Sequence, residues 1–198
     1  MPLDTANALV TLNETRDFLK ISEEVEDGVI ENIINQSSEF ANTYTRRKLK
    51  SRAVTEYYDG DGSDTLIFLN YPVTALTSIH DDVSRSFAGS SLIPVSDYVL
   101  DGTSGILRFL NGRVSSEGRA NIKVVGTVGL ATIPADLREA VLLICEHTYR
   151  RLYQDQRVGV ASETIGEKTT QFTADPIPPR SKLILAHYTS TRVWQYGF

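Results

Sequence analysis

The residues best placed to do chemistry in this 198-residue chain are the carboxylates of the segment Asp59-Gly60-Asp61-Gly62-Ser63-Asp64. Carboxylates this close together can bind calcium, so one hypothesis is a calcium-dependent binding module that uses this loop. An EF-hand loop, however, needs a ligand at position 5, glycine at 6 and glutamate at 12, where counting from Asp59 gives Ser63, Asp64 and Asn70. The Asp-Gly steps favour a tight turn instead, with Gly60, Gly62 and later Gly102 supplying positive φ angles.

Other reactive side chains are few and scattered. His80, His147 and His187 fall in different expected elements, and none has a metal-ligand spacing to another ligand type. Cys145 is the only cysteine and ends an apolar run, which is typical of a buried, inert thiol. No phosphate-binding glycine pattern is present. We therefore predict a non-enzymatic protein without catalytic residues, metal or cofactor; the alternative is an enzyme that uses His147 or a carboxylate pair in a cleft.

Composition indicates a folded, acidic protein. Hydrophobic residues make up 41% of the chain and charged residues 23%, and the formal net charge is −5. A negative surface argues against general nucleic-acid binding but suits a passage through which DNA slides without sticking. No segment approaches the roughly 20 apolar residues of a membrane span, and we see no export signal, so we expect synthesis in the cytoplasm and no membrane partner.

Hydrophobic spacing predicts helices at the beginning of the chain. Thr11 and Glu14 form a capping-box pattern, which predicts a short helix to about residue 20. Apolar residues then recur at spacings of three and four from Val25 to Tyr44, which predicts a helix of about 20 residues. Arg46, Arg47 and Lys48 follow, where their charges complement the helix dipole.

From residue 53 the period changes to that of β-strands. Runs rich in Val, Ile, Thr, Tyr and Phe predict strands near residues 54–58, 65–69, 76–81, 97–100, 106–110 and 121–128. Helix resumes with Pro134 as its first residue and is expected to reach about residue 153. Its centre, residues 140–145, is apolar on all sides, so we expect the long helix on one flank and another subunit on the other, although burial within one chain is also possible.

The last part of the chain is polar and then aromatic. Residues 158–172 predict an extended loop or hairpin, and a last short helix from Arg180 places Leu183, Ile184 and His187 on one face. The aromatic end either docks on a partner or folds back on the chain. Together these patterns predict an α+β fold: a small helical bundle with an inserted antiparallel β subdomain and an extended C-terminal tail. The expected boundaries are 1–52, 53–130, 131–157, 158–175 and 176–198.

The order of these features resembles the head-to-tail connector (adaptor) family of long-tailed bacteriophages, prophages and gene transfer agents. The resemblance covers about residues 8–189. The residues that carry it are Thr11-Leu12-Asn13-Glu14 with Phe18-Leu19, Thr55 with Tyr57-Tyr58-Asp59-Gly60-Asp61-Gly62, Tyr71-Pro72-Val73, the segment 126–129, Ile133-Pro134-Ala135-Asp136-Leu137, Tyr149-Arg150-Arg151, the polar segment 159–166 and Pro178-Pro179. The chain departs from shorter members in residues 82–95 and in its aromatic end.

Membership of this family would imply a homo-oligomeric ring, typically a dodecamer, below the capsid portal in the virion neck. Its partners would be further copies of itself, the portal protein, a stopper or tail-completion protein, and DNA that passes through without specific binding. The expected portal-docking residues are Arg192, Trp194, Tyr196 and Phe198. The expected subunit interface consists of Leu142, Leu143, Tyr149 and Arg150, and the expected channel or next-component loop contains Ser162, Glu163, Thr164, Glu167 and Lys168. Another phage neck or tail-completion protein is the alternative within this class.

Overall fold

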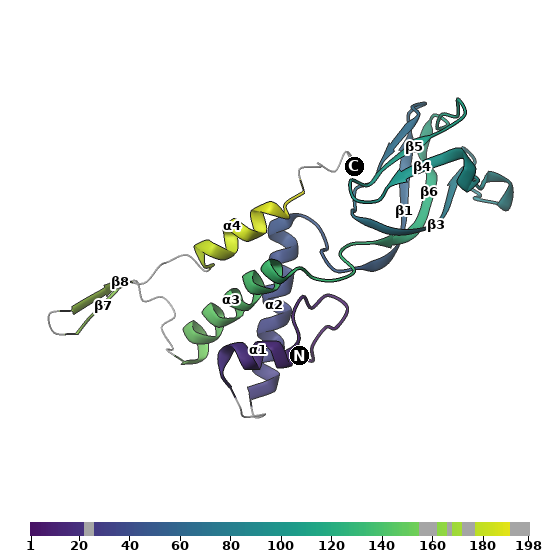
Figure 1. Ribbon diagram of the computed structural model, residues 1–198. Helices are drawn as coiled ribbons and strands as arrows, with labels where there is room; N and C mark the ends of the chain where they lie inside the picture. The colour runs from purple at the N-terminus through teal and green to yellow at the C-terminus, as the bar shows by residue number, and fades with distance from the viewer. Residues whose placement is uncertain (22–25, 155–161, 166–167, 172–176, 191–198) are drawn as a thin grey trace. The chain divides into compact units, whose positions relative to one another are not determined.

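The computed structural model describes residues 1–21, 26–154, 162–165, 168–171 and 177–190 (Figure 1). The chain forms two compact units. The helical unit consists of Met1–Arg47 and Ile133–Thr191, and the β unit consists of Lys48–Thr132. The β segment predicted at residues 53–130 lies within the β unit, so the chain enters and leaves the β unit between two parts of the helical unit.

The helical unit is built around α3 (Ala135–Tyr149), which packs against α1 (Leu12–Leu19), α2 (Asp27–Thr45) and α4 (Pro179–His187). The apolar spacing of α2 places Ile30, Ile33 and Ile34 in the interior, where they are at most 1% exposed. None of the helices in the described part of the chain is long and apolar enough to cross a membrane.

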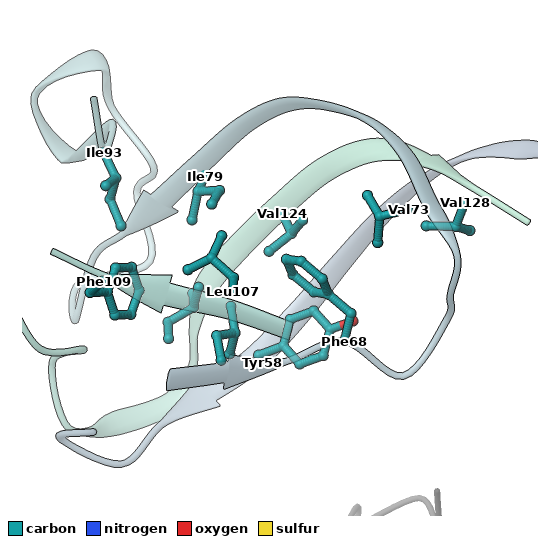
Figure 2. Close-up of a cluster of buried hydrophobic side chains, with 11 residues drawn as sticks. Tyr58, Phe68, Val73, Ile79, Ile93, Leu107, Phe109, Val124 and Val128 are labelled. Atoms are coloured by element: carbon teal, nitrogen blue, oxygen red, sulfur yellow. The ribbon is translucent and has the colours of Figure 1, made fainter. Parts of the chain in front are cut away.

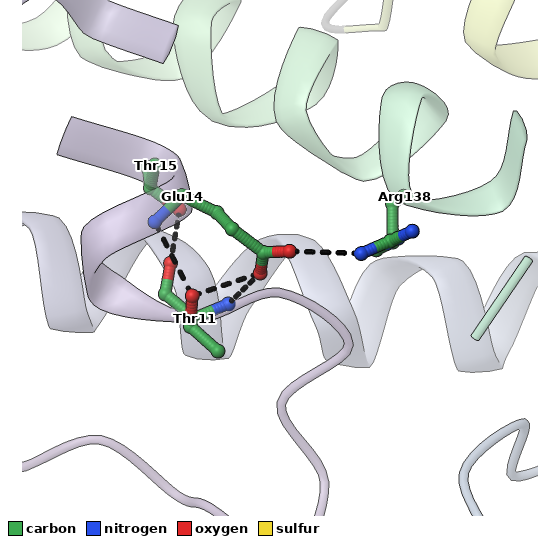
Figure 3. A network of polar contacts seen from close by, with 4 residues as sticks. All are labelled: Thr11, Glu14, Thr15 and Arg138. Atoms are coloured by element: carbon green, nitrogen blue, oxygen red, sulfur yellow. Dashed lines mark hydrogen bonds and ion pairs between the residues drawn. The ribbon is translucent and has the colours of Figure 1, made fainter. Parts of the chain in front are cut away.

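The predicted capping box at the start of α1 is confirmed (Figure 3). The Glu14 backbone N–H donates to the Thr11 hydroxyl at 3.2 Å, and the Thr11 backbone N–H donates to the Glu14 carboxylate at 2.8 Å. The second carboxylate oxygen of Glu14 accepts from Arg138 of α3 at 3.0 Å. The backbone N–H of Thr11 and the nearby guanidinium hold the pKa of Glu14 below its usual value. One side chain therefore both caps α1 and links it to α3.

Both ends of the central helix α3 differ from the sequence prediction. Pro134 has an extended backbone with ψ 152°, so it precedes the first helical residue and does not occupy the first turn. The α-helical hydrogen bonding ends at Tyr149, and a π-helical turn, Arg150–Gln154, follows in place of a straight continuation to residue 153.

Six strands form two antiparallel sheets in the β unit. The first sheet has the order β1-β6-β3, with β1 Arg52–Gly60, β6 Gly118–Val128 and β3 Val73–Asp81. The second has the order β2-β5-β4, with β2 Thr65–Ile67, β5 Ile106–Phe109 and β4 Tyr98–Asp101. Short 3-10 turns, η2 Gly89–Ser91 and η3 Val95–Asp97, lie between β3 and β4. The predicted strands are present, although their ends differ.

One hydrophobic core lies between the two sheets (Figure 2). Alternate residues of each strand point inward, so Ile79 and Ile122 of the first sheet meet Leu107 of the second, and all three are fully buried. The Phe68 ring contacts the Tyr58 ring edge to face, with centroids 5.6 Å apart. The β unit therefore has its own core.

A separate antiparallel hairpin consists of β7 (Ser162–Ile165) and β8 (Lys168–Gln171). Its backbone register pairs Ser162 with Gln171 and Ile165 with Lys168. Of the two interpretations of this polar segment, extended loop or hairpin, the described residues form the hairpin.

Candidate functional site

The carboxylates of residues 59–64 are each held by a different donor of the chain. Asp59 accepts from the backbone N–H of Ala120 at 2.6 Å, Asp61 accepts from that of Ser63 at 3.0 Å, and Asp64 accepts from the Thr65 hydroxyl at 2.9 Å. They do not converge on a common point. Within the described ranges, no three His, Cys, Asp or Glu side chains are grouped as ligands for a metal ion. The hydrogen bonds of these carboxylates to donors of the chain support the predicted structural turn.

The glycines of this turn have two different roles. Gly62 has φ +76°, as predicted, but Gly60 and Gly102 do not adopt the positive φ angles expected of them. Both permit close backbone contact instead: a Cβ on Gly60 would lie 1.9 Å from the Ser116 carbonyl oxygen, and one on Gly102 would lie 2.4 Å from that of Val73.

Asn121 is a structural residue that the sequence analysis missed. Its side chain is 1% exposed, and its Oδ1 accepts from the Gly60 backbone N–H at 2.9 Å. Its Nδ2 donates to the Ser116 carbonyl oxygen at 2.8 Å and to Asp81 at 3.4 Å. A buried asparagine satisfied in this way links β1 to the segment before β6. Nothing in the local sequence pattern marks it.

The candidate histidines and the cysteine are distributed over both units. His80 is on β3, where its Nδ1 lies 3.2 Å from the Ser91 hydroxyl; His147 is half-buried on α3, and His187 is exposed on α4. Cys145 is fully buried, and burial raises the pKa of its thiol to about 12. The thiol is therefore neutral at physiological pH, as expected for an inert interior cysteine.

The central helix α3 exposes part of its apolar run. Leu137, Val141 and Ile144 are at most 4% exposed and face the other helices, whereas Leu142 and Leu143 are only half-buried in a single chain. At 100° per residue, the two leucines lie on the side opposite the buried stripe. This is the side that we expect another subunit to cover, and Leu142 and Leu143 remain predicted interface residues.

The other two predicted interface residues make contacts within the chain. The Tyr149 hydroxyl donates to Glu26, which immediately precedes α2, in a short hydrogen bond. Arg150 is exposed and forms an ion pair of 2.7 Å with Glu146 one turn earlier. The interface role of both residues remains a prediction, and the structure adds that they also anchor the end of α3.

A second tyrosine joins the helices by the same kind of bond. The Tyr188 hydroxyl donates to both carboxylate oxygens of Asp136, at 2.8 and 2.9 Å. The pKa of Tyr149 is raised to about 12 mainly by its bond to Glu26, and the pKa of Tyr188 is raised to about 12 by burial and by its bond to Asp136. Neutral phenols therefore link α3 to the start of α2 and to the end of α4.

We expect the helical unit to lose stability in alkali because of these two tyrosines. Their pKa values are higher in the folded protein, about 12, than the value of about 10 in an unfolded chain. The stabilisation is thus fully present below pH 10 and is lost as the pH rises through 12. The double variant Tyr149→Phe, Tyr188→Phe should unfold at a lower temperature at pH 8 and show a flatter dependence of melting temperature on pH between 10 and 12.

The matched control for this pH series is Tyr57→Phe, because Tyr57 lies in the β unit. That variant should retain the alkaline dependence of the wild type in thermal unfolding followed by circular dichroism. An equally steep loss in the double variant would contradict the assignment to Tyr149 and Tyr188.

The remaining predicted site residues divide between described and undescribed parts of the chain. Ser162, Glu163 and Thr164 lie on β7, and Lys168 begins β8. The structure therefore brings these loop residues onto one hairpin. Outside the described residues lie Glu167, Arg192, Trp194, Tyr196 and Phe198.

The fold matches chains in solved structures of gene transfer agent particles. One is a chain in the "Neck of empty GTA particle computed with C6 symmetry", where GTA denotes a gene transfer agent, with a TM-score of 0.61, 18% identity, and coverage of 99% of this chain and 97% of that chain. Another is a chain in the "Virion of native gene transfer agent (GTA) particle", with a TM-score of 0.62, 17% identity and coverage of 99% and 96%. A third is a chain in the "Neck of native GTA particle computed with C12 symmetry", with a TM-score of 0.62, 15% identity and the same coverage. The predicted α+β class is confirmed, and the same fold occurs in these chains of gene transfer agent particles.

The sequence assigns the chain to a particular protein family, which the fold alone does not. Residues 8–191 match the model of the head completion proteins, so the chain belongs to the head completion protein family. This confirms the resemblance to the connector family of phages and gene transfer agents. No curated protein is detectably similar in sequence to this chain.

Proposed function

We propose that this protein is a non-enzymatic subunit of a ring in the virion neck, where it joins the head to the tail below the portal. The observation that carries the proposal is the family match over residues 8–191, together with a fold that covers 97% of a chain from a gene transfer agent neck. The two related neck structures were computed with C6 and C12 symmetry, which supports a dodecameric ring for this chain.

The charge distribution supports a channel through which DNA passes without being bound tightly by the channel wall. The segments 1–47 and 133–191 contain 11 Lys and Arg against 16 Asp and Glu, whereas the β unit contains 8 against 9. Repeating the acidic helical unit around a ring gives a negative lining, which repels phosphate. The hairpin of β7 and β8, with Ser162, Glu163, Thr164 and Lys168, is the candidate for contact with DNA or with a stopper or tail-completion protein.

The test is electron microscopy of the purified full chain, alone and with its portal protein. We expect rings, and we expect these rings to bind at the tail-facing end of the portal. A species that stays monomeric in the presence of the portal would contradict the proposal.

Deletion of residues 191–198 should weaken attachment to the portal without unfolding the protein. The aromatic residues Trp194, Tyr196 and Phe198 come after α4 in the sequence, and aromatic anchors dominate binding energy at protein interfaces. Loss of such anchors typically costs 2 kcal/mol or more, so we expect a drop of about thirtyfold in affinity in a pull-down or interferometry titration.

The control for the deletion is Val114→Ser, which changes an apolar residue of the β unit that is 52% exposed. That variant should bind the portal as the wild type does. Equal affinity of the truncated and full-length chains would exclude the tail as the docking segment.

A further inference from the structure

Helix α4 presents a large apolar residue to solvent on its outer face. Leu183 is 71% exposed, whereas Ser181 and Leu185, about half a turn away on either side, are fully buried. The Ser181 hydroxyl donates to the Ala140 carbonyl oxygen at 3.0 Å, so this is the side of α4 that packs on α3. Leu183, Ile184 and His187 were predicted to share one face of this helix; Leu183 and His187 are exposed, and Ile184 is half-buried.

The outer face of α4 is also basic. The helix contains Arg180, Lys182 and His187 but no Asp or Glu. Arg180 forms an ion pair of 2.8 Å with Glu139, and its side chain is still 69% exposed. A guanidinium has five N–H donors, so it can bind a second carboxylate.

The open side of α3 has the complementary character. Leu142 and Leu143 are half-buried there, between Glu139 and Glu146, at spacings of three and four residues that place all four on one side of the helix. The side chains of Glu139 and Glu146 are 40% and 27% exposed. This is an apolar strip with a carboxylate at each end, and each carboxylate is partly exposed although it also forms an ion pair within the chain, Glu139 with Arg180 and Glu146 with Arg150.

The contacts between subunits of a cyclic ring are heterologous, so each chain must present two different and complementary surfaces. From the apolar residues and the charges of these two surfaces, we infer that Leu183 of one copy packs on Leu142 and Leu143 of the next, with Arg180 directed at Glu146 of that copy. The occupant of the α3 strip is thus α4 of a second copy. This inference rests on the proposed ring and names the side chains that close it.

Cross-linking tests the contact directly. In the full chain carrying Leu183→Cys with Leu142→Cys, mild oxidation should give a ladder of disulfide-linked oligomers on a non-reducing gel. The native Cys145 is fully buried and does not compete. Neither Leu183→Cys alone nor Leu142→Cys alone should give the ladder, because each disulfide needs one cysteine from each surface.

Substitution gives the quantitative test. Leu183→Asp should raise the protein concentration needed for half of the chains to enter rings by at least about tenfold, as measured by light scattering. The matched control is Val99→Asp in the β unit, where Val99 is 57% exposed; it should assemble as the wild type does. Circular dichroism should show that both variants remain folded, because both positions are mostly exposed.

The outcomes separate this contact from the ring itself. Failure of the wild-type chain to form rings would overturn the proposed function and this inference with it. Wild-type rings together with unchanged assembly of Leu183→Asp and no ladder would overturn the contact alone. Rings of Leu183→Asp that assemble normally but no longer attach to the portal would also overturn it, because α4 would then be a portal-binding surface.

Discussion

Phe68→Ala is expected to destabilise the β unit by about 3–5 kcal/mol, the usual cost of removing a buried aromatic side chain. Phe68 is 1% exposed, and its ring packs edge to face against Tyr58 in the core between the sheets. Because the helical unit has a separate set of buried residues, we expect the loss to appear in the unfolding of the β unit, measured by urea denaturation followed by circular dichroism.

The neighbouring residue provides the control for this experiment. Ile67 is 54% exposed on the outer face of β2, so Ile67→Ala should change the free energy of unfolding by no more than about 0.5 kcal/mol. Similar losses for both variants would mean that the buried position of Phe68 or the exposed position of Ile67 is assigned incorrectly. Phe68→Ala leaves the proposed subunit contact between α3 and α4 unchanged. A defect in ring assembly in this variant would therefore show that the β unit also contributes to assembly.

Gly60→Ala is the second substitution with a large expected effect, although it adds only one methyl group. The new Cβ would lie 1.9 Å from the Ser116 carbonyl oxygen and 3.0 Å from Nδ2 of Asn121. The backbone must move apart, and the bond between the Gly60 N–H and Asn121 is then weakened or lost. Overpacking and an unsatisfied buried group each cost about 1–3 kcal/mol, so we expect a total loss of about 2–6 kcal/mol in urea denaturation.

Gly89 supplies the matched control. A Cβ at Gly89 would meet no atom within 4 Å, so Gly89→Ala should leave the free energy of unfolding nearly unchanged. A loss of stability in Gly60→Ala no greater than that in Gly89→Ala would show that the contact between Gly60 and Ser116 is not tightly constrained.

The sequence by itself determined the features that depend on local interactions. The capping box of Thr11 and Glu14 joins groups three residues apart, and the apolar period of α2 identifies its buried stripe because side-chain direction follows helix geometry. The same holds for the strand periods and for the order of motifs that indicated the connector family. Gly62 also follows a local rule, since its positive φ belongs to the turn itself.

Only the tertiary structure decided which distant segments meet. Gly60 is required because the Ser116 carbonyl oxygen lies against it. Asn121 is required because its side chain forms hydrogen bonds with both Gly60 and Ser116, although Asn121 and Gly60 are 61 residues apart in the sequence. The Asp59 carboxylate, for example, accepts from the backbone N–H of Ala120, 61 residues away along the chain. Likewise, Leu183 is exposed because α4 turns its opposite side, with the buried Ser181 and Leu185, toward the interior, where Ser181 donates to α3. Local sequence specifies backbone period and turn chemistry, but contacts between segments far apart along the chain depend on how the whole chain packs.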